Sequence, residues 1–133
     1  MAKLLFVEDE KNLRTLYHAE FSSDGHEVLI ARSGEEALAL LQREHPDVLI
    51  LDIRLEGMDG LAAMQRILQL QPDLPVVINS AYSSFMDDFK SWPAHAYVIK
   101  SSDLTELKAR VADCLRFRVD GDGSTAAAPS TTA

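Results

Sequence analysis

The chain has 133 residues, of which 47% are hydrophobic and 26% are charged, and its formal net charge is −8. This length suits one domain with a sizeable core, and the acidic balance argues against direct binding of nucleic acid, whose phosphates it would repel. A single cysteine, Cys114, excludes an internal disulfide, so a reducing, cytoplasmic location is favoured. The apolar run at residues 4–7 is too short for a signal peptide or a membrane span.

Short apolar runs alternate with segments of helical periodicity along most of the chain. We expect strands at residues 3–7, 28–31, 48–51, 75–79 and 94–99. About five helices are expected between and after them, because apolar residues recur there every three or four positions. The first helix opens at Asp9 or Glu10, and Ser33 with Glu36 forms a capping box for the second. The aromatic spacing from Tyr82 to Trp92 indicates a short or irregular helix.

This alternation predicts the α/β class: a doubly wound parallel sheet with helices on both faces, forming a three-layer sandwich. From residue 119 onward the composition shifts to Gly, Ser, Thr, Ala and Pro, which cannot bury a core. We therefore expect a folded domain at 1–118 and a disordered tail or linker remnant at 119–133.

Polar residues stand where the expected strands end. Asp52 follows the central strand, and Glu8 and Asp9 follow the first. Ligands bind outside the carboxyl ends of the strands in open parallel sheets, and clustered carboxylates stay ionised when a cation joins them. The sequence therefore predicts a cation site at this edge.

Two further strand ends add groups that suit phosphate chemistry. Ser80 follows the fourth strand and can donate its hydroxyl to a phosphoryl oxygen, while Lys100 follows the fifth and offers a mobile positive charge. Asp52 can accept a phosphoryl group as an acyl phosphate, and the remaining acids suit Mg²⁺, which prefers oxygen ligands. Taken singly, each residue has a simpler explanation as a turn, a cap or a solvated strand end; their coincidence favours a site.

Five segments, in order, resemble the CheY-like receiver domains of bacterial two-component response regulators. They are LLFVEDE, LIARSGEEAL, DVLILDIRLEGMDGL, PVVINSAY and AYVIKSSDLTEL, and they span residues 3 to about 118. The resemblance implies a flavodoxin-like, five-stranded sheet in the order 2-1-3-4-5.

The resemblance also implies a role for each matching residue at the metal and acceptor sites. Asp52 matches the phosphorylated aspartate, and Lys100 matches the site lysine. Asp9 matches a direct Mg²⁺ ligand, as do Asp52 and the backbone carbonyl of Arg54. Glu8 would act on the metal through water.

Further matches concern the switch and the lifetime of the phosphorylated state. Ser80 matches the switch hydroxyl, and Ala81 supplies a backbone amide to the phosphoryl group. Tyr97 matches the aromatic residue that changes rotamer on activation. Arg54 and Tyr82 fall where side chains tune the lifetime of the phosphorylated state.

Two departures from the family pattern lie beside these residues. Leu55-Glu56 replaces the usual methionine-proline, and Lys100-Ser101 replaces a lysine-proline whose bond is cis. A cis bond before a non-proline residue costs roughly 3 kcal/mol. We expect either a strained cis Lys100-Ser101 bond or a shifted loop there.

The expected function is that of a phosphoacceptor switch rather than an enzyme acting on a separate substrate. A sensor histidine kinase, a phosphotransfer protein or a small phosphodonor would phosphorylate Asp52. The domain would then present an altered face to an output domain or partner protein, without binding a membrane; a phosphorylation-dependent homodimer stays open. The alternative is a pseudo-receiver that works without phosphorylation. A phosphohydrolase is disfavoured because Arg54 stands where its second acid would be needed.

Overall fold

The computed structural model describes residues 2–54, 59–81 and 92–123, with side chains described to residue 116. Five strands are present: β1 (Lys3–Val7), β2 (Glu27–Ala31), β3 (Val48–Leu51), β4 (Val76–Ser80) and β5 (Ala96–Ile99). Over the same residues there are four helices: α1 (Lys11–Ser23), α2 (Gly34–Leu40), α3 (Gly60–Leu70) and α4 (Thr105–Gly123). The helix expected around Tyr82–Trp92 lies almost entirely outside the described residues.

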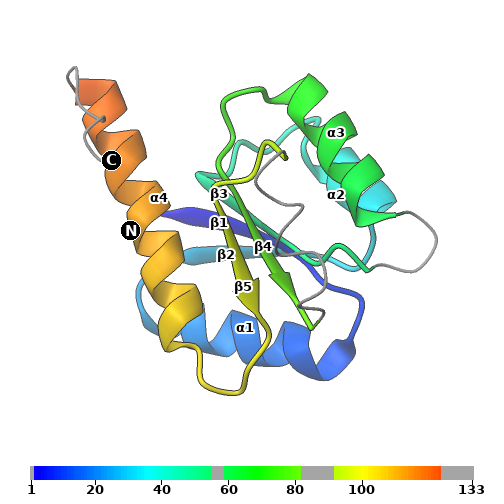
Figure 1. Cartoon of the computed structure of the whole chain (residues 1–133), viewed down its shortest axis with the longest axis vertical. Helices are drawn as coiled ribbons and strands as arrows, with labels where there is room; N and C mark the ends of the chain where they lie inside the picture. Colours follow the sequence, from blue (N-terminus) through cyan, green and yellow to red (C-terminus); the bar gives the residue numbers. More distant parts are fainter. Residues whose placement is uncertain (1, 55–58, 82–91, 124–133) are drawn as a thin grey trace.

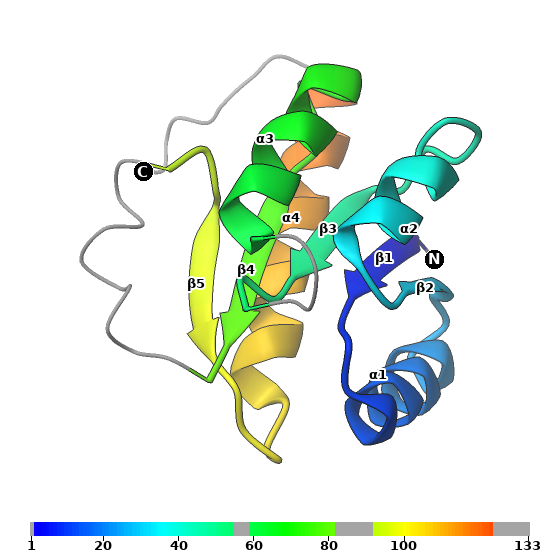
Figure 2. The same cartoon turned by 90° about the vertical axis from the view of Figure 1, so that its right-hand side faces the viewer.

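All four strand pairs are parallel, and the sheet order is β2-β1-β3-β4-β5, as the resemblance implied. Helices α2 and α3 cover one face of the sheet and α1 and α4 cover the other (Figures 1 and 2). The expected three-layer α/β architecture is therefore confirmed.

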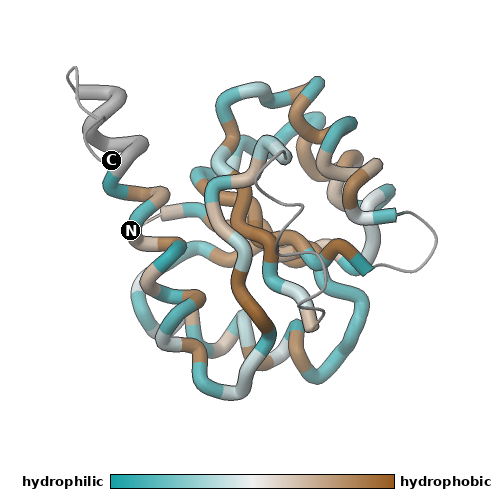
Figure 3. The backbone as a smooth tube through the Cα atoms, viewed as in Figure 1, coloured by the Kyte–Doolittle hydropathy of each residue, from teal (hydrophilic) through white to brown (hydrophobic). Residues whose placement is uncertain are grey.

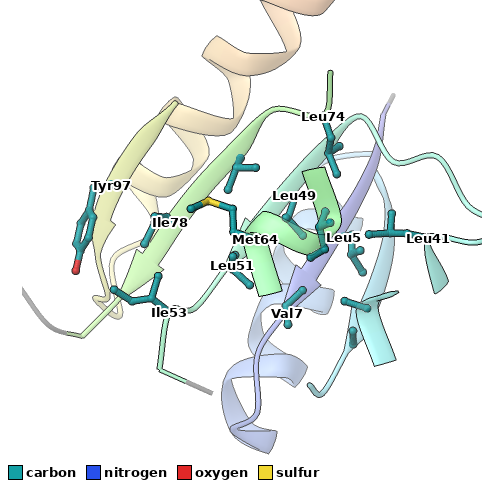
Figure 4. Packing of buried hydrophobic residues seen from close by; sticks show 14 residues of the cluster. Leu5, Val7, Leu41, Leu49, Leu51, Ile53, Met64, Leu74, Ile78 and Tyr97 are labelled. Carbon is teal, nitrogen blue, oxygen red and sulfur yellow. The ribbon is translucent and has the colours of Figure 1, made fainter. Parts of the chain in front are cut away.

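Side chains of each strand alternate between two cores, because successive residues of a strand point to opposite faces. On the α2/α3 face, Leu5 and Val7 pack with Leu49, Leu51 and Ile78 (Figure 4). On the α1/α4 face, the intervening residues pack against α1 and α4; they include Leu4, Phe6, Val48, Ile50, Val77 and Val98. The strands run through the most hydrophobic part of the molecule (Figure 3), as expected for a parallel sheet buried on both faces.

Helix starts follow the capping chemistry that the sequence indicated. The Glu10 carboxylate accepts a hydrogen bond from the Leu13 N–H, and the Ser33 hydroxyl accepts one from the Glu36 N–H. Glu36 in turn accepts from the N–H of Arg32 rather than from that of Ser33. These bonds satisfy amides that a helix start leaves unpaired.

Two expectations need correction. Helix α4 continues to Gly123, so the boundary expected at 118 lies inside a helix; once formed, a helix extends by one backbone hydrogen bond per added residue and can outrun its apolar stripe. Of the two alternatives expected at Lys100–Ser101, the strained cis bond is wrong, because this peptide bond is trans, the favoured form before a non-proline residue. Within the described residues, no helix has the length and apolarity needed to cross a membrane.

Candidate functional site

Three carboxylates meet at the carboxyl edge of the sheet. Glu8 and Asp9 follow β1, Asp52 follows β3, and these strands are neighbours. Each acid places an oxygen within 4.8 Å of an oxygen of the other two. Glu8 is 2% exposed and Asp52 is 6% exposed, whereas Asp9 is half-buried. Buried like charges this close require compensation by a cation.

Lys100 supplies a positive charge to this cluster. Its Nζ lies 2.7 Å from Oδ2 of Asp52 and 2.9 Å from Oε1 of Glu8. Its own N–H donates to the carbonyl oxygen of Ser80 at 2.8 Å, which anchors the lysine to the end of β4. The predicted meeting of Lys100 with Asp52 is therefore observed, although the bond to Ser101 is trans.

The electrostatics of this cluster reflect opposing effects. Burial raises the pKa of Glu8, and the hydrogen bond and charge of Lys100 oppose that rise. Burial alone would lower the pKa of Lys100, but its hydrogen bonds to Asp52 and Glu8 raise it above its usual value. The ammonium group is thus held charged between two carboxylates.

Backbone groups hold the acids in place. The Arg54 N–H donates to Oδ1 of Asp52 at 2.9 Å, and the Glu10 N–H donates to Oε2 of Glu8 at 3.2 Å. The Arg14 guanidinium donates to the backbone carbonyl of Glu8 at 3.2 Å. The first two bonds fix the carboxylates of Asp52 and Glu8, and the third fixes the backbone of Glu8.

The predicted switch residues lie on the other face of the sheet. Ser80 ends β4 fully buried, and Tyr97 on β5 packs at 5% exposure among the residues of the α2/α3 core. Burial raises the pKa of Tyr97, and a hydrogen bond with Ser80 opposes this. Ala81 is exposed immediately beyond β4. Tyr82, expected to tune the phosphorylated state, lies outside the described residues, and Arg54 is exposed.

One buried polar pair beneath the acids was not predicted from the sequence. The Nδ2 of Asn79 donates to the Tyr17 hydroxyl at 2.9 Å, and both residues are buried. The signal was present in the sequence, because Asn79 interrupts an otherwise apolar buried strand and a buried amide requires a partner.

The donor set at this edge fits Mg²⁺. Glu8, Asp9 and Asp52 offer hard carboxylate oxygens, the ligand type that Mg²⁺ takes in proteins, and an ion of this kind keeps several waters beside one or two carboxylates. Chemically, the edge combines an oxygen nucleophile, acids for a cation and a mobile positive charge, which together suit phosphoryl transfer.

The comparisons with known proteins agree with this geometry. The family model "Response regulator receiver domain" matches residues 4–112. The probable transcriptional regulator ycf27 of Porphyridium aerugineum is 34% identical over 120 residues, covering 89% of this chain and 49% of that protein. The chain thus spans about half the length of the curated relatives of this type that it matches.

Two solved structures contain a similar domain. The response regulator protein TrrA from Thermotoga maritima, in complex with Mg²⁺-BeF, is 37% identical with a TM-score of 0.80, covering 86% of this chain and 99% of that one. The same regulator in complex with the histidine kinase ThkA gives a TM-score of 0.79 at the same identity and coverage. From its sequence match, its strand order and its acidic edge, the chain belongs to the response regulator receiver domain family.

Proposed function

We propose that this receiver domain is a Mg²⁺-dependent phosphoryl acceptor and that Asp52 carries the phosphoryl group. The observation that supports this best is the contact of Lys100 with Asp52 and Glu8 at 2.7 and 2.9 Å. It gathers a nucleophile, a neighbouring acid and a cationic side chain at the strand ends where ligands bind in such sheets.

In the proposed reaction, a carboxylate oxygen of Asp52 attacks the phosphorus atom of a phosphodonor. The new O–P bond forms as the bond from phosphorus to the leaving group breaks, and the leaving group departs with the electron pair. The Arg54 N–H holds Oδ1 of Asp52. The Lys100 ammonium can move from Oδ2 of Asp52 to an oxygen of the incoming phosphoryl group as negative charge gathers there.

A metal ion would be held by Asp9 and Asp52, by the backbone carbonyl of Arg54, and by Glu8 through water. When bound, Mg²⁺ supplies positive charge that neutralises the acids and the transferring phosphoryl group. The half-buried position of Asp9, next to the more buried Glu8 and Asp52, leaves this residue the most open to a hydrated ion.

The proposed phosphodonor is a sensor histidine kinase, a phosphotransfer protein or a small phosphodonor. The complex of TrrA with the kinase ThkA supports a kinase partner for this related domain. After phosphorylation, the Ser80 hydroxyl and the Ala81 N–H would bind the phosphoryl oxygens, and Tyr97 would follow Ser80 because the two are hydrogen-bonded. A partner protein or output domain would then distinguish the two states by its differential affinity for them.

Labelling with a radioactive small phosphodonor tests this proposal. We expect incorporation that is labile to acid, base and hydroxylamine, that requires Mg²⁺ and that falls to background in Asp52→Asn. Asp59→Asn is the matched control, because Asp59 is an exposed aspartate whose side chain caps α3 by accepting from the Leu61 N–H. Undiminished labelling of Asp52→Asn would contradict the proposal and indicate another acceptor, whereas no labelling of the wild-type chain would favour the pseudo-receiver alternative.

A further inference from the structure

The buried Tyr17–Asn79 pair lies directly beneath the acidic edge. The parallel register pairs Leu51 with Ile78, so the next residues, Asp52 and Asn79, lie beside each other on neighbouring strands. Asn79 also immediately precedes Ser80. Because Tyr17 is in α1, the pair joins this helix to the end of β4. That end contains Asn79, which neighbours Asp52, and Ser80, whose hydroxyl is the proposed switch group.

Tyr17 is on the same face of the sheet as Glu8. Its ring stacks on Phe6 with centroids 5.1 Å apart and an interplanar angle of 19°. Phe6 and Glu8 are two residues apart along one strand direction, and side chains at this spacing point to the same face. The charges of Glu8, Lys100 and Asp52 all act on the Tyr17 hydroxyl, whose pKa is raised chiefly by burial.

The pair contains more donors than its own hydrogen bond uses. A phenol has one polar proton and a carboxamide has two, and the Asn79–Tyr17 bond occupies one of these three. Ionised Glu8 and Asp52 are acceptors without donors. Both members of the pair are buried, at 1% exposure for Tyr17 and 3% for Asn79, so bulk solvent does not screen them from the nearby carboxylates.

We propose that Tyr17 and Asn79 are positioning residues for the acidic edge: their hydrogen-bonded pair fixes the end of β4 beside Asp52 against helix α1 and so increases the affinity of the site for a divalent cation. Residues that surround the ligands of a metal site hold those ligands in position, and removing them typically weakens metal binding by about 10- to 100-fold. The inference deepens the proposed function, on which it rests, by adding two residues to the support of its metal site.

The test is a Mn²⁺ titration of the folded full chain followed by electron paramagnetic resonance of the free ion, a readout that does not require phosphorylation. The variants are Tyr17→Phe, Asn79→Leu and the double variant. We expect each to bind Mn²⁺ about tenfold more weakly than the wild-type chain. The double variant should lose no more affinity than the weaker-binding single variant, because the two residues act as one unit.

Stability is measured in parallel, since a merely structural role would lower stability alone. Each single variant leaves a buried polar group without its partner, whereas the double variant replaces both by apolar groups and should unfold at a higher urea concentration than Asn79→Leu. Cys114→Ala is the matched control: Cys114 is 3% exposed in the same core, so the variant loses stability but should bind Mn²⁺ like the wild-type chain.

Mn²⁺ affinity of the folded double variant within twofold of the wild-type value would overturn the inference. Failure of the wild-type chain to bind Mn²⁺ and to accept phosphate would instead overturn the proposed function, so the two failures are distinguishable.

Discussion

At its carboxyl edge the sheet presents two chemically different faces. Side chains two residues apart in a strand point to the same face. On the α1/α4 face, the apolar side chains of three strands are therefore followed two residues later by charged ones, namely Glu8, Asp52 and Lys100. On the α2/α3 face lie the neutral hydroxyls of Ser80 and Tyr97. A shift of one residue in a strand exchanges its faces. The register of the strands therefore places the charged groups, which suit phosphoryl transfer, on one face. It places the hydroxyls proposed to respond to phosphorylation on the other.

The largest expected effect is on the charged face. Lys100→Met should lower the free energy of unfolding by about 3 kcal/mol in the presence of a chelator, because it leaves the buried carboxylates of Glu8 and Asp52 without their cation. Urea unfolding measures this, and added Mg²⁺ should restore part of the loss.

Lys108→Met is the control for that variant. Lys108 bridges Glu20 and Asp24 on the surface between α4 and α1, where exposed ion pairs contribute less than about 1 kcal/mol. Equal losses in the two variants would show that the buried ion pairs of Lys100 are no stronger than surface pairs.

The second effect concerns the attachment of α3 to the loop after Asp52. A Cβ at Gly60 would collide with the backbone of Ile53 and with the carbonyl oxygen of Asp52. Gly60→Ala should therefore cost about 2 kcal/mol, as overpacking against backbone does, measured by urea unfolding. Gly25→Ala is the comparison: Gly25 has φ of 95° but open space around its Cβ position, so about 1 kcal/mol is expected from backbone conformation. A smaller loss at Gly60 than at Gly25 would contradict close packing at this junction.

A smaller loss of stability is expected for a variant on the α2/α3 face, where the Ser80 and Tyr97 hydroxyls lie. Tyr97→Phe removes the hydrogen bond to Ser80 but keeps the ring, so it should cost about 1 kcal/mol of unfolding free energy. Phosphate incorporation should persist, because the hydroxyl lies on the face opposite the acids. Loss of labelling in Tyr97→Phe would show that the two faces do not act separately.

The smallest effect is a pH dependence in the α1/α4 core. Burial raises the pKa of Cys114 to about 11, so the folded chain keeps the thiol proton at a pH where the unfolded chain has begun to release it. Stability should therefore fall as pH rises from about 9 toward 11, with a contribution below about 1 kcal/mol at pH 9.5. Urea unfolding of wild type and Cys114→Ala across this range should show a shallower decline in the variant; parallel curves would contradict the assignment.

The sequence predicted the strand ends well because apolar runs in this chain stop at charged residues. Glu8, Asp52 and Lys100 each follow a buried strand, so parallel pairing alone brings them together. The strand order and the carried-over roles came from resemblance to a family. The helix boundary at Gly123 was missed because composition does not record how far backbone hydrogen bonding continues.

Contacts between residues far apart in the sequence were harder to predict. Tyr17 and Asn79 are 62 positions apart. Asn79 in a buried strand indicates that a partner is needed, but only the packing of α1 on the sheet identifies Tyr17 as that partner. The Lys100–Ser101 bond shows the opposite case, because the general preference for trans was a better guide than the family pattern.

The central claim, that Asp52 is the phosphoryl acceptor, is tested most directly by reductive trapping. Borohydride reduces an acyl phosphate, so treating the phosphorylated chain with tritiated borohydride converts the acceptor aspartate to labelled homoserine, which peptide mapping can place. We predict label at position 52, dependent on Mg²⁺ during phosphorylation. Label at Asp9, at Glu8 as the corresponding longer alcohol, or at any other position would contradict the account.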